Sequence, residues 1–211
     1  MIGVHGPVPR SPRGWFVDLS QHNSLRPADW AYLEAHGCSA VMLRACDGTT
    51  LDTAFHDHAG WAIRHHMAVG AYLFLRPTNV RAQVDTLLGA LRSLPVPIWH
   101  IAVDVEDGKG RPRWTADDLP GNRTRQAVWS IYRATGARPW VYTYLAFWRQ
   151  WLAGERPLDA YPLWAARYDR NLTPEQLEQQ FGRPVVAWQY GGGPVDGKEG
   201  SPVIDKNVVL R

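Results

Sequence analysis

Cysteine is scarce in this sequence: among 211 residues only Cys38 and Cys46 occur. They flank an apolar run that predicts a strand, and eight residues of strand span about 26 Å. Because the Cα atoms of a disulfide lie within about 7 Å of each other, these two cysteines cannot pair. We therefore expect two free, buried thiols, which fits synthesis in a reducing cytoplasm.

Long apolar runs are also missing, since no stretch approaches the roughly 18 uninterrupted apolar residues of a membrane span. Residues 1–14 are rich in proline, glycine and arginine and lack the apolar core of a Sec signal peptide. We therefore expect no membrane insertion, and another release route if the protein acts outside the membrane.

The chain lacks a dense cluster of one charge: its net charge is +3, and lysine and arginine are scattered. This pattern does not favour nucleic acid, although a mild basic excess suits an anionic partner such as the bacterial wall. Eleven tryptophans stand out. We expect most of them to pack in the core, and the others to offer flat faces on which sugar rings stack.

Short β-rich runs alternate with helical segments along the chain. The pattern predicts eight strands: Trp15–Leu19, Ser39–Ala45, Val69–Leu75, Trp99–Val105, Pro139–Tyr144, Leu163–Arg167, Val185–Tyr190 and Val203–Val208. It predicts helices at Pro27–His36, Thr53–Met67, Val80–Leu94, Asn122–Thr135 and Ala146–Ala153, and a short one that begins at Pro174. Asn79 and Thr173 are expected to cap helix starts, and Gly136 to follow a helix end.

Strands that alternate with helices favour a parallel α/β barrel. After the fifth strand the connections become too short or too rich in glycine for a full helix at every step, and residues 191–202 are expected to form a turn. We therefore predict one truncated barrel of five β/α units followed by three strands with reduced connections. It would span residues 15–211 after an N-terminal extension, residues 1–14. A doubly wound open sheet is the alternative.

Four acidic residues lie at the ends of predicted strands, where the active sites of α/β barrels gather. They are Asp18, Asp104, Glu106 and Asp205. Residues i and i+2 of a strand point to the same face, so Asp104 and Glu106 should project together with their Cα atoms about 6.6 Å apart. Two carboxyls this close cannot both ionise easily, and partial burial raises the pKa of one. A raised carboxyl suits a general acid for glycosidic-bond cleavage, whereas a solvated strand end is the alternative.

Motifs in a fixed order along the chain resemble those of glycoside hydrolase family 25, the family of the Chalaropsis-type muramidases and many phage endolysins. The resemblance runs from about Trp15 to Val208. It rests on Asp18-Leu19-Ser20 with Asn23 and Trp30, on Leu43 to Gly48, on Gly70 to Phe74 with Arg76-Pro77, on Val103 to Glu106, on Val141 to Thr143, on Leu163 to Ala166, on Trp188 to Tyr190 with Val195 and Gly197, and on Ile204 to Asn207.

The resemblance implies a lysozyme-type N-acetylmuramidase that hydrolyses the β-1,4 bond from N-acetylmuramic acid to N-acetylglucosamine in peptidoglycan, with no cofactor and no metal. It implies that Glu106 is the general acid and base, that Asp104 orients or polarises the substrate, and that Asp18 and Asp205 shape the electrostatics of the site. The residues implied in substrate binding are Tyr72, Arg76, Tyr142, Trp188 and Gln189, although packing inside the barrel is the alternative for the aromatic ones.

Three departures from the family pattern bear on substrate preference rather than on catalysis. Leu73 replaces the usual histidine, Asp47 replaces glutamate, and His58 stands where asparagine is common. All four acidic positions are filled.

Other classes of function have less support. No His-Glu-x-x-His motif or Gly-x-Ser-x-Gly elbow occurs in the sequence, which disfavours a zinc hydrolase and a serine nucleophile. A family 18 chitinase also uses Asp-x-Glu, but its longer signature needs acids where Trp99 and Ala102 stand. A catalytically silent wall-binding barrel, the remaining alternative, would gain nothing from crowded carboxyls.

No residue stands out as an enzymic nucleophile, because Asp104 faces the same way as Glu106. We therefore predict net retention through attack by the substrate's own 2-acetamido oxygen. The missing signal peptide favours a phage endolysin that stays in the host cytoplasm until the membrane is opened, with export by another route as the alternative. The sequence leaves the host and the oligomeric state open.

Overall fold

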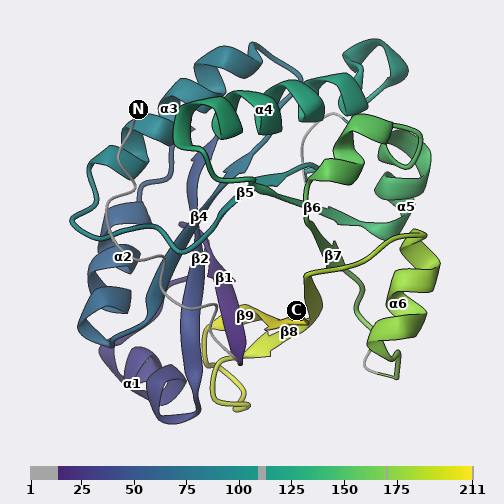
Figure 1. The fold of residues 1–211 in the computed structure, drawn as a ribbon. Helices are drawn as coiled ribbons and strands as arrows, with labels where there is room; N and C mark the ends of the chain where they lie inside the picture. Colours follow the sequence, from purple (N-terminus) through teal and green to yellow (C-terminus); the bar gives the residue numbers. More distant parts are fainter. Residues whose placement is uncertain (1–13, 109–112, 170, 211) are drawn as a thin grey trace.

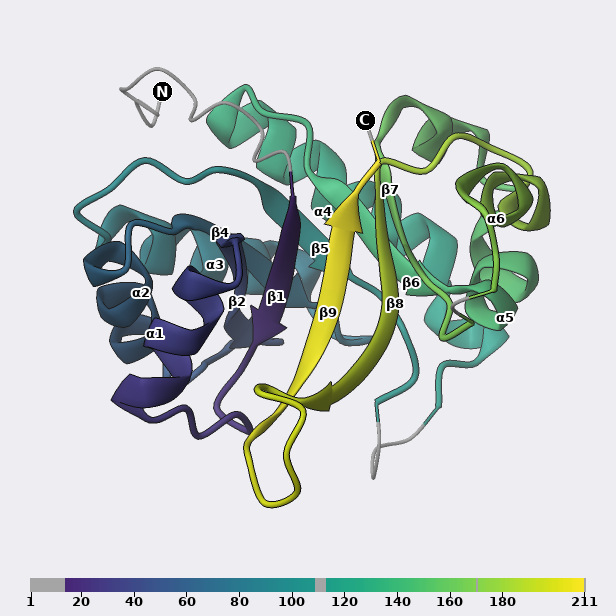
Figure 2. The same ribbon diagram turned by 90° about the horizontal axis from the view of Figure 1, so that it is seen from below.

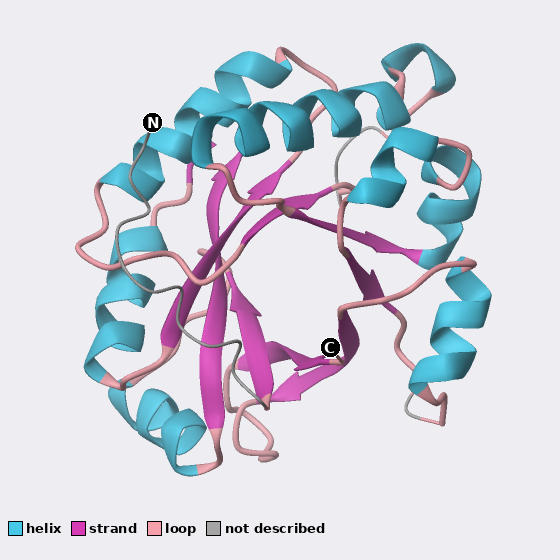
Figure 3. Cartoon of the chain, viewed as in Figure 1, coloured by secondary structure: helices cyan, strands magenta, loops and turns pink. Residues whose placement is uncertain are grey.

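A closed barrel of eight strands, surrounded by helices, forms the centre of the computed structural model, which describes residues 14–108, 113–169 and 171–210 (Figures 1 and 3). Of the expected N-terminal extension, residues 1–13 therefore lie outside the described residues. The barrel strands are β1 (Trp15–Leu19), β2 (Cys38–Asp47), β4 (Ala68–Phe74), β5 (Ile101–Asp104), β6 (Trp140–Tyr144), β7 (Leu163–Ala166), β8 (Ala187–Pro194) and β9 (Val203–Val209). A two-residue strand, β3 (Thr50–Leu51), pairs with the end of β2 and was not predicted.

The strand order is β1-β9-β8-β7-β6-β5-β4-β2, and pairing of β1 with β2 closes the barrel. Closure excludes the open doubly wound sheet. The pairs among β1, β2 and β4 to β8 are parallel, as predicted, but β9 is antiparallel to both β8 and β1. A parallel connection needs a crossover of about a dozen residues or more, and the segment between β8 and β9 is a shorter hairpin.

The glycine-rich segment after Tyr190 was expected to be a turn, and this prediction is wrong for residues 191–194. They continue β8 and pair with β9. Gly192 lies opposite Asp205, and a Cβ atom at Gly192 would be 2.6 Å from Oδ1 of Asp205. Glycine here permits a close approach of a side chain to the backbone, which is a regular use of glycine within a strand.

Helices cover most of the outer face of the barrel. They are α1 (Pro27–Ala35), α2 (Phe55–Arg64), α3 (Val80–Arg92), α4 (Pro120–Thr135), α5 (Leu145–Phe147) and α6 (Pro174–Phe181). A π-helical turn at Trp148–Leu152 continues α5, and 3-10 turns lie at Ala116–Asp118 and Arg156–Ala160. Seen from below, none of the described helices lies over the outer face of β8 and β9 (Figure 2). In the described ranges we find no helix whose length and apolar character would let it cross a membrane.

The three residues predicted to cap or follow helices are confirmed in those positions. The side chain of Asn79 accepts a hydrogen bond from the backbone of Ala82, and Thr173 does the same for Gln176. Gly136 follows α4 with φ 75°, the left-handed conformation that glycine adopts without strain.

Two layers of buried side chains hold the barrel together. The outer layer lies between the strands and the helices and is mostly aliphatic. The inner layer lies inside the barrel. Its large members Phe16, Met42, Trp99, Trp140 and Trp164 fill the end where the parallel strands begin, and Tyr72 and Tyr142 lie further along their strands. Most of the tryptophans are buried, as predicted, and Cys38 and Cys46 are free and buried. Among the described residues, Phe16 and the three tryptophans of the inner layer form an aromatic plug that closes this end of the barrel.

Gly70 on β4 provides a test of this inner packing. A Cβ atom there would overlap Sδ of Met42 and lie 3.0 Å from the carbonyl oxygen of His100. We expect Gly70→Ala to lower the free energy of unfolding by about 1–3 kcal/mol, because a tightly packed interior must shift. In the control Gly89→Ala, on the exposed side of α3, the new methyl group meets nothing within 4 Å. Its free energy of unfolding should increase by about 0.5–1 kcal/mol, because alanine favours a helix more than glycine does. Urea unfolding measures both, and equal changes would contradict the packing described.

Candidate active site

Three strands bring the four predicted acidic residues to one mouth of the barrel. Asp18 lies near the end of β1, Asp104 ends β5, and Glu106 follows two residues later. Asp205 lies near the start of β9, which reaches the same mouth because β9 runs in the opposite direction. All four line one cavity of about 570 Å³, the central cleft. The rest of its lining is Ser20, His22, Asn23, Arg44, Asp47, Tyr72, Phe74, Arg76, Gly108, Tyr142, Trp164 and Gln189.

Asp18 and Asp205 are directly opposed across the antiparallel pairing of β1 and β9. Like charges in this position repel each other. Loss of solvent, and secondarily the charge of Asp205, raise the pKa of Asp18 to about 7. Oδ1 of Asp18 accepts hydrogen bonds from Asn207 Nδ2 at 2.7 Å and from Gln189 Nε2 at 3.0 Å, and these donors partly offset the rise in pKa. Asp18 therefore keeps its proton to a higher pH than an ordinary carboxyl.

A hydrogen-bonded network fixes the two amide side chains that contact Asp18. Oε1 of Gln189 accepts from the hydroxyl of Tyr142 at 2.8 Å, so its NH₂ group must face Asp18. Oδ1 of Asn207 accepts from the indole N–H of Trp164 at 2.9 Å, which orients that amide in the same way. Gln189 and Tyr142 were predicted to bind substrate, and both line the cleft. The contact of Asn207 with Asp18 was not predicted.

Asp104 and Glu106 both project into the central cleft, as their spacing predicted. The strand formally ends at Asp104, but Val105 still pairs with β6, because its N–H donates to the carbonyl oxygen of Tyr142 at 3.0 Å. Asp104 is 6% exposed and Glu106 is half-buried. Burial raises the pKa of Asp104 well above its usual range, and the charges of Glu106 and Asp18 raise it further. At least one carboxyl of this pair therefore has a raised pKa, as expected, and it is Asp104 for which burial is the main cause.

Oδ1 of Asp104 is buried and has no hydrogen-bond partner among the described residues. A buried acceptor without a partner costs about 1–3 kcal/mol, so such atoms are rare in folded proteins unless a ligand completes them. The atom lies on a side chain that lines the cleft, where a substrate N–H group would satisfy it.

The backbone of Glu106 is held by a contact that the sequence did not reveal. The indole N–H of Trp114 donates to the carbonyl oxygen of Glu106 at 3.0 Å. The next residue, Asp107, accepts from the backbone of Trp114 at 3.0 Å and from the hydroxyl of Tyr144 at 3.1 Å. Trp114 comes from the loop that follows the motif, whereas Tyr144 lies 37 residues from Asp107 and is brought to it by the fold.

The other residues predicted to bind substrate divide into two groups. Tyr72 and Arg76 line the central cleft, and Arg76 forms a forked ion pair with Asp47. Trp188 is only 7% exposed and lies in the outer core, where its indole N–H donates to the carbonyl oxygen of Arg167 at 2.8 Å. Because neighbouring side chains of a strand point to opposite faces, Gln189 faces the cleft and Trp188 faces away. The structure thus places Trp188 in the core, contrary to the expectation that it lines the sugar groove.

Two smaller cavities adjoin the central cleft. The first, of about 400 Å³, is called the side lobe; it shares Arg44, Asp47 and Arg76 with the cleft. Its other lining residues are Gln21, Gly48, Thr49, Thr50, Leu51, Asp52, Pro77 and Thr78. The second, of about 330 Å³, is called the tyrosine lobe and shares Glu106, Tyr142 and Gln189 with the cleft. It is completed by Tyr144, Leu145, Ala146, Ala166, Arg167 and Tyr168.

Tyr168 was not predicted. Its ring is largely exposed at the rim of the tyrosine lobe, while its hydroxyl donates to Oδ1 of Asp205 at 2.9 Å. The four carboxyls thus have different surroundings, which is the arrangement that lets neighbouring carboxyls take different roles in proton transfer. In the described ranges no three histidine, cysteine or acidic side chains are arranged to hold a metal ion.

The model of the family described as Glycosyl hydrolases family 25 matches residues 17–196 of the chain. Among solved structures, the muramidase from Acremonium alcalophilum shares 22% identity over 93% of both chains, with a TM-score of 0.72. The lysozyme from Streptomyces coelicolor shares 21% identity over 96% of this chain and 94% of its own, with a TM-score of 0.72. The catalytic domain of endolysin ply40 from bacteriophage P40 of Listeria monocytogenes shares 19% identity over 92% of both chains, with a TM-score of 0.68. No curated protein sequence matches this chain.

The raised pKa of Asp18 predicts how stability depends on pH. Its folded-state pKa of about 7 exceeds the ordinary 3.8, so the stability it contributes is full below about pH 4 and is lost as the pH rises to about 7. Asp18→Asn removes this titration. The free energy of unfolding of the variant, minus that of the wild type, should therefore increase by up to a few kcal/mol across this window and then level off. Urea unfolding in steps from about pH 4 to 8 measures the difference, and a constant difference would refute the assignment.

Proposed function

This chain belongs to family 25 of the glycosyl hydrolases, and from that premise we propose that it is a peptidoglycan hydrolase of the lysozyme type. The bond cut would be the β-1,4 bond from N-acetylmuramic acid to N-acetylglucosamine. The observation that carries the proposal is the convergence of Asp18, Asp104, Glu106 and Asp205 in one cleft at the mouth of the barrel. The muramidase, lysozyme and endolysin structures that share its fold support the same substrate class.

Glu106 is the general acid in this proposal. It lines both the central cleft and the tyrosine lobe, so a glycan strand that passes from one to the other places a glycosidic bond beside its carboxyl. Protonation of the departing O4 oxygen of N-acetylglucosamine makes that oxygen a better leaving group. The hydrogen bond from Trp114 to the backbone of Glu106 holds the acid in position.

Asp104 binds the acetamide of the muramyl residue. Its unpartnered Oδ1 accepts the acetamide N–H, which aims the acetamide carbonyl oxygen at the anomeric carbon. That oxygen attacks C1 as the C1–O4 bond breaks, and an oxazolinium ion forms. Glu106, now ionised, takes a proton from water as the water oxygen attacks C1. The bond from C1 to the acetamide oxygen breaks, which restores the acetamide. The two displacements give net retention.

The remaining polar residues support this chemistry. Asp18 and Asp205 place negative potential where positive charge develops on the substrate, which lowers the barrier most when the groups are already fixed. Tyr72, Arg76, Tyr142 and Gln189 contact the sugars. The wall substrate is compatible with a phage endolysin, which acts once the host membrane is opened, and equally with a bacterial enzyme exported by another route.

Glu106→Gln tests the acid. We expect this variant to keep its thermal stability and to lose about 10²–10⁴-fold in rate, the usual contribution of general acid catalysis. Asp104→Asn should also lose most of the hydrolysis rate. Glu199→Gln, on the exposed β8–β9 hairpin, should hydrolyse walls at the wild-type rate. The assay counts new reducing ends in purified walls by borohydride reduction and mass analysis. Near wild-type rates for Glu106→Gln would exclude the assignment, and reduced glucosamine ends instead of muramic acid ends would exclude the proposed bond.

The route through the acetamide has its own test. A synthetic substrate in which a hydroxyl replaces the muramyl 2-acetamido group lacks the internal nucleophile, so its turnover should fall to background. With the natural substrate, NMR should show the β-anomer as the first product, because two displacements retain configuration. An undiminished rate on the analogue, or an α-anomer from the natural substrate, would rule out the acetamide as the nucleophile.

A further inference from the structure

Arg44 is a buried cation whose hydrogen-bonding capacity is only partly used. It lies on β2, is 8% exposed, and lines both the central cleft and the side lobe. Its Nε donates to Oδ2 of Asp52 at 2.7 Å. Within the described part of the chain its two terminal nitrogens have no acceptor. A guanidinium carries five N–H donors, so four of them are left to meet whatever occupies the cavities.

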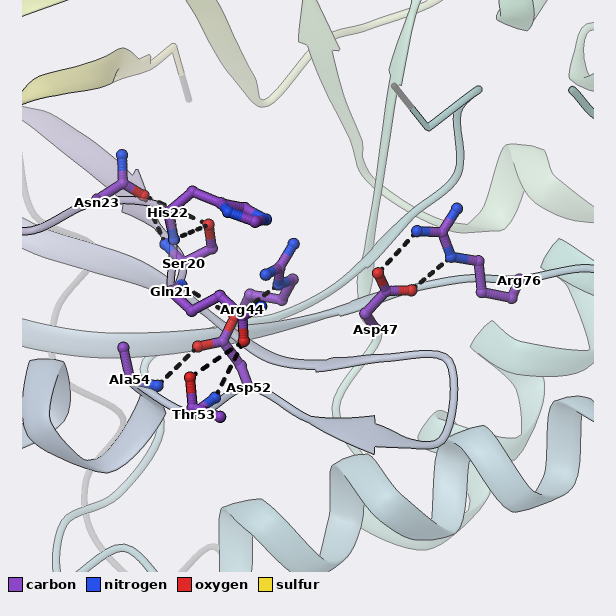
Figure 4. Close-up of polar contacts among 10 residues, drawn as sticks. All are labelled: Ser20, Gln21, His22, Asn23, Arg44, Asp47, Asp52, Thr53, Ala54 and Arg76. Carbon is purple, nitrogen blue, oxygen red and sulfur yellow. Dashed lines mark hydrogen bonds and ion pairs between the residues drawn. The ribbon is translucent and has the colours of Figure 1, made fainter. Parts of the chain in front are cut away.

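Asp52 holds Arg44 in a fixed position (Figure 4). Oδ2 of Asp52 also accepts from the backbone of Gln21 at 3.1 Å, and Oδ1 accepts from the backbone of Ala54 at 3.0 Å. The carboxylate is buried and tied to the backbone on both sides. Because the partner cannot move, the guanidinium is already oriented before any ligand arrives, which reduces the entropy lost on binding.

The side lobe differs in character from the tyrosine lobe. Threonines and a proline form much of its wall, and no described residue that lines it is aromatic. The second ion pair, Arg76 with Asp47, also lines it (Figure 4). The tyrosine lobe, by contrast, is lined by Tyr142, Tyr144 and Tyr168. Aromatic faces suit sugar rings, whereas polar walls with a guanidinium suit carboxylate and amide groups. The glycan backbone therefore fits the central cleft and the tyrosine lobe better than the side lobe.

We propose that the side lobe receives the lactyl branch of the muramyl residue, with its attached peptide, and that the terminal nitrogens of Arg44 bind the carboxyl-derived oxygen of that branch. The inference rests on the proposed function, since it names the part of the substrate that enters a second cavity. A branch that leaves the sugar sideways needs a cavity beside the cleft, and the side lobe meets the cleft at Arg44. Its volume of about 400 Å³ lies within the range of ligand-binding pockets. Arg44 then distinguishes muramyl glycans from chitin-like glycans, which lack the lactyl group.

Binding to a catalytically inactive protein tests the subsite without turnover. In the Glu106→Gln background, calorimetry compares three probes: a glucosamine–muramic acid tetrasaccharide with free lactyl carboxylates, the same tetrasaccharide carrying a stem dipeptide, and chitotetraose. Arg44→Lys keeps the positive charge beside Asp52 but lacks the planar fork. It should raise the Kd of both muramyl probes about 10- to 100-fold and that of chitotetraose less than about twofold. Arg26 also pairs with a buried aspartate, Asp29 on α1, so Arg26→Lys is the matched control. It should leave the Kd of all three probes unchanged.

Thr50→Trp distinguishes binding of the peptide from binding of the lactyl group. Thr50 is exposed in the wall of the side lobe, and a tryptophan there would fill the lobe. It should weaken the dipeptide probe about tenfold more than the peptide-free probe. If Arg44→Lys fails to fold, as thermal unfolding would show, this variant alone decides the proposal. Equal losses for all probes, or no loss for the muramyl ones, would overturn the subsite. Failure of the proposed function would appear separately, as wild-type protein that releases no muramic acid ends from walls.

Discussion

The antiparallel pairing of β9 between β8 and β1 is the interaction on which the rest of the structure depends. It closes the barrel, and its register sets Asp205 opposite Asp18 on one side and opposite Gly192 on the other. Gly192 leaves the space that the carboxyl of Asp205 occupies. A shift of one residue in β9 would send Asp205 to the outer face, because side chains alternate along a strand. The site and the closure of the fold therefore come from the same strand.

Crowding the carboxyls at one mouth costs free energy, and the surroundings of Asp18 and Asp104 offset this cost to different degrees. Asp18 receives hydrogen bonds from two fixed amides, yet burial and Asp205 still raise its pKa to about 7. Asp104 is buried more deeply, and its Oδ1 has no partner in the described part of the chain. The two amides only partly offset the cost of a charge on Asp18, whereas Oδ1 of Asp104 is left as an acceptor without a partner among the described residues. Such local instability persists only where the surrounding packing is strong, and the aromatic plug and the outer core supply that packing.

The central cleft also adjoins two lobes of different chemical character. Tyrosines line the lobe beside Glu106, and arginine–aspartate pairs line the lobe beside Asp47. Asp47 forms a forked ion pair with Arg76. A glycan chain with an anionic branch has two matching parts: sugar rings with apolar faces, and a polar substituent. The site is thus shaped by the wall of the groove as much as by its acids.

Local patterns in the sequence were enough to locate the eight barrel strands, the caps at Asn79, Thr173 and Gly136, the unpaired cysteines and the four acids at one mouth. These features depend on side-chain periodicity, turn chemistry and short-range geometry, which neighbouring residues determine. Only the tertiary structure decided the direction of β9, the strand conformation of residues 191–194, and the burial of Trp188 in the outer core. It also decided that burial raises the pKa of Asp104 and that Tyr168, Trp114 and Arg44 join the site. These properties follow from strand pairing and desolvation between residues far apart in the chain, which no local pattern encodes.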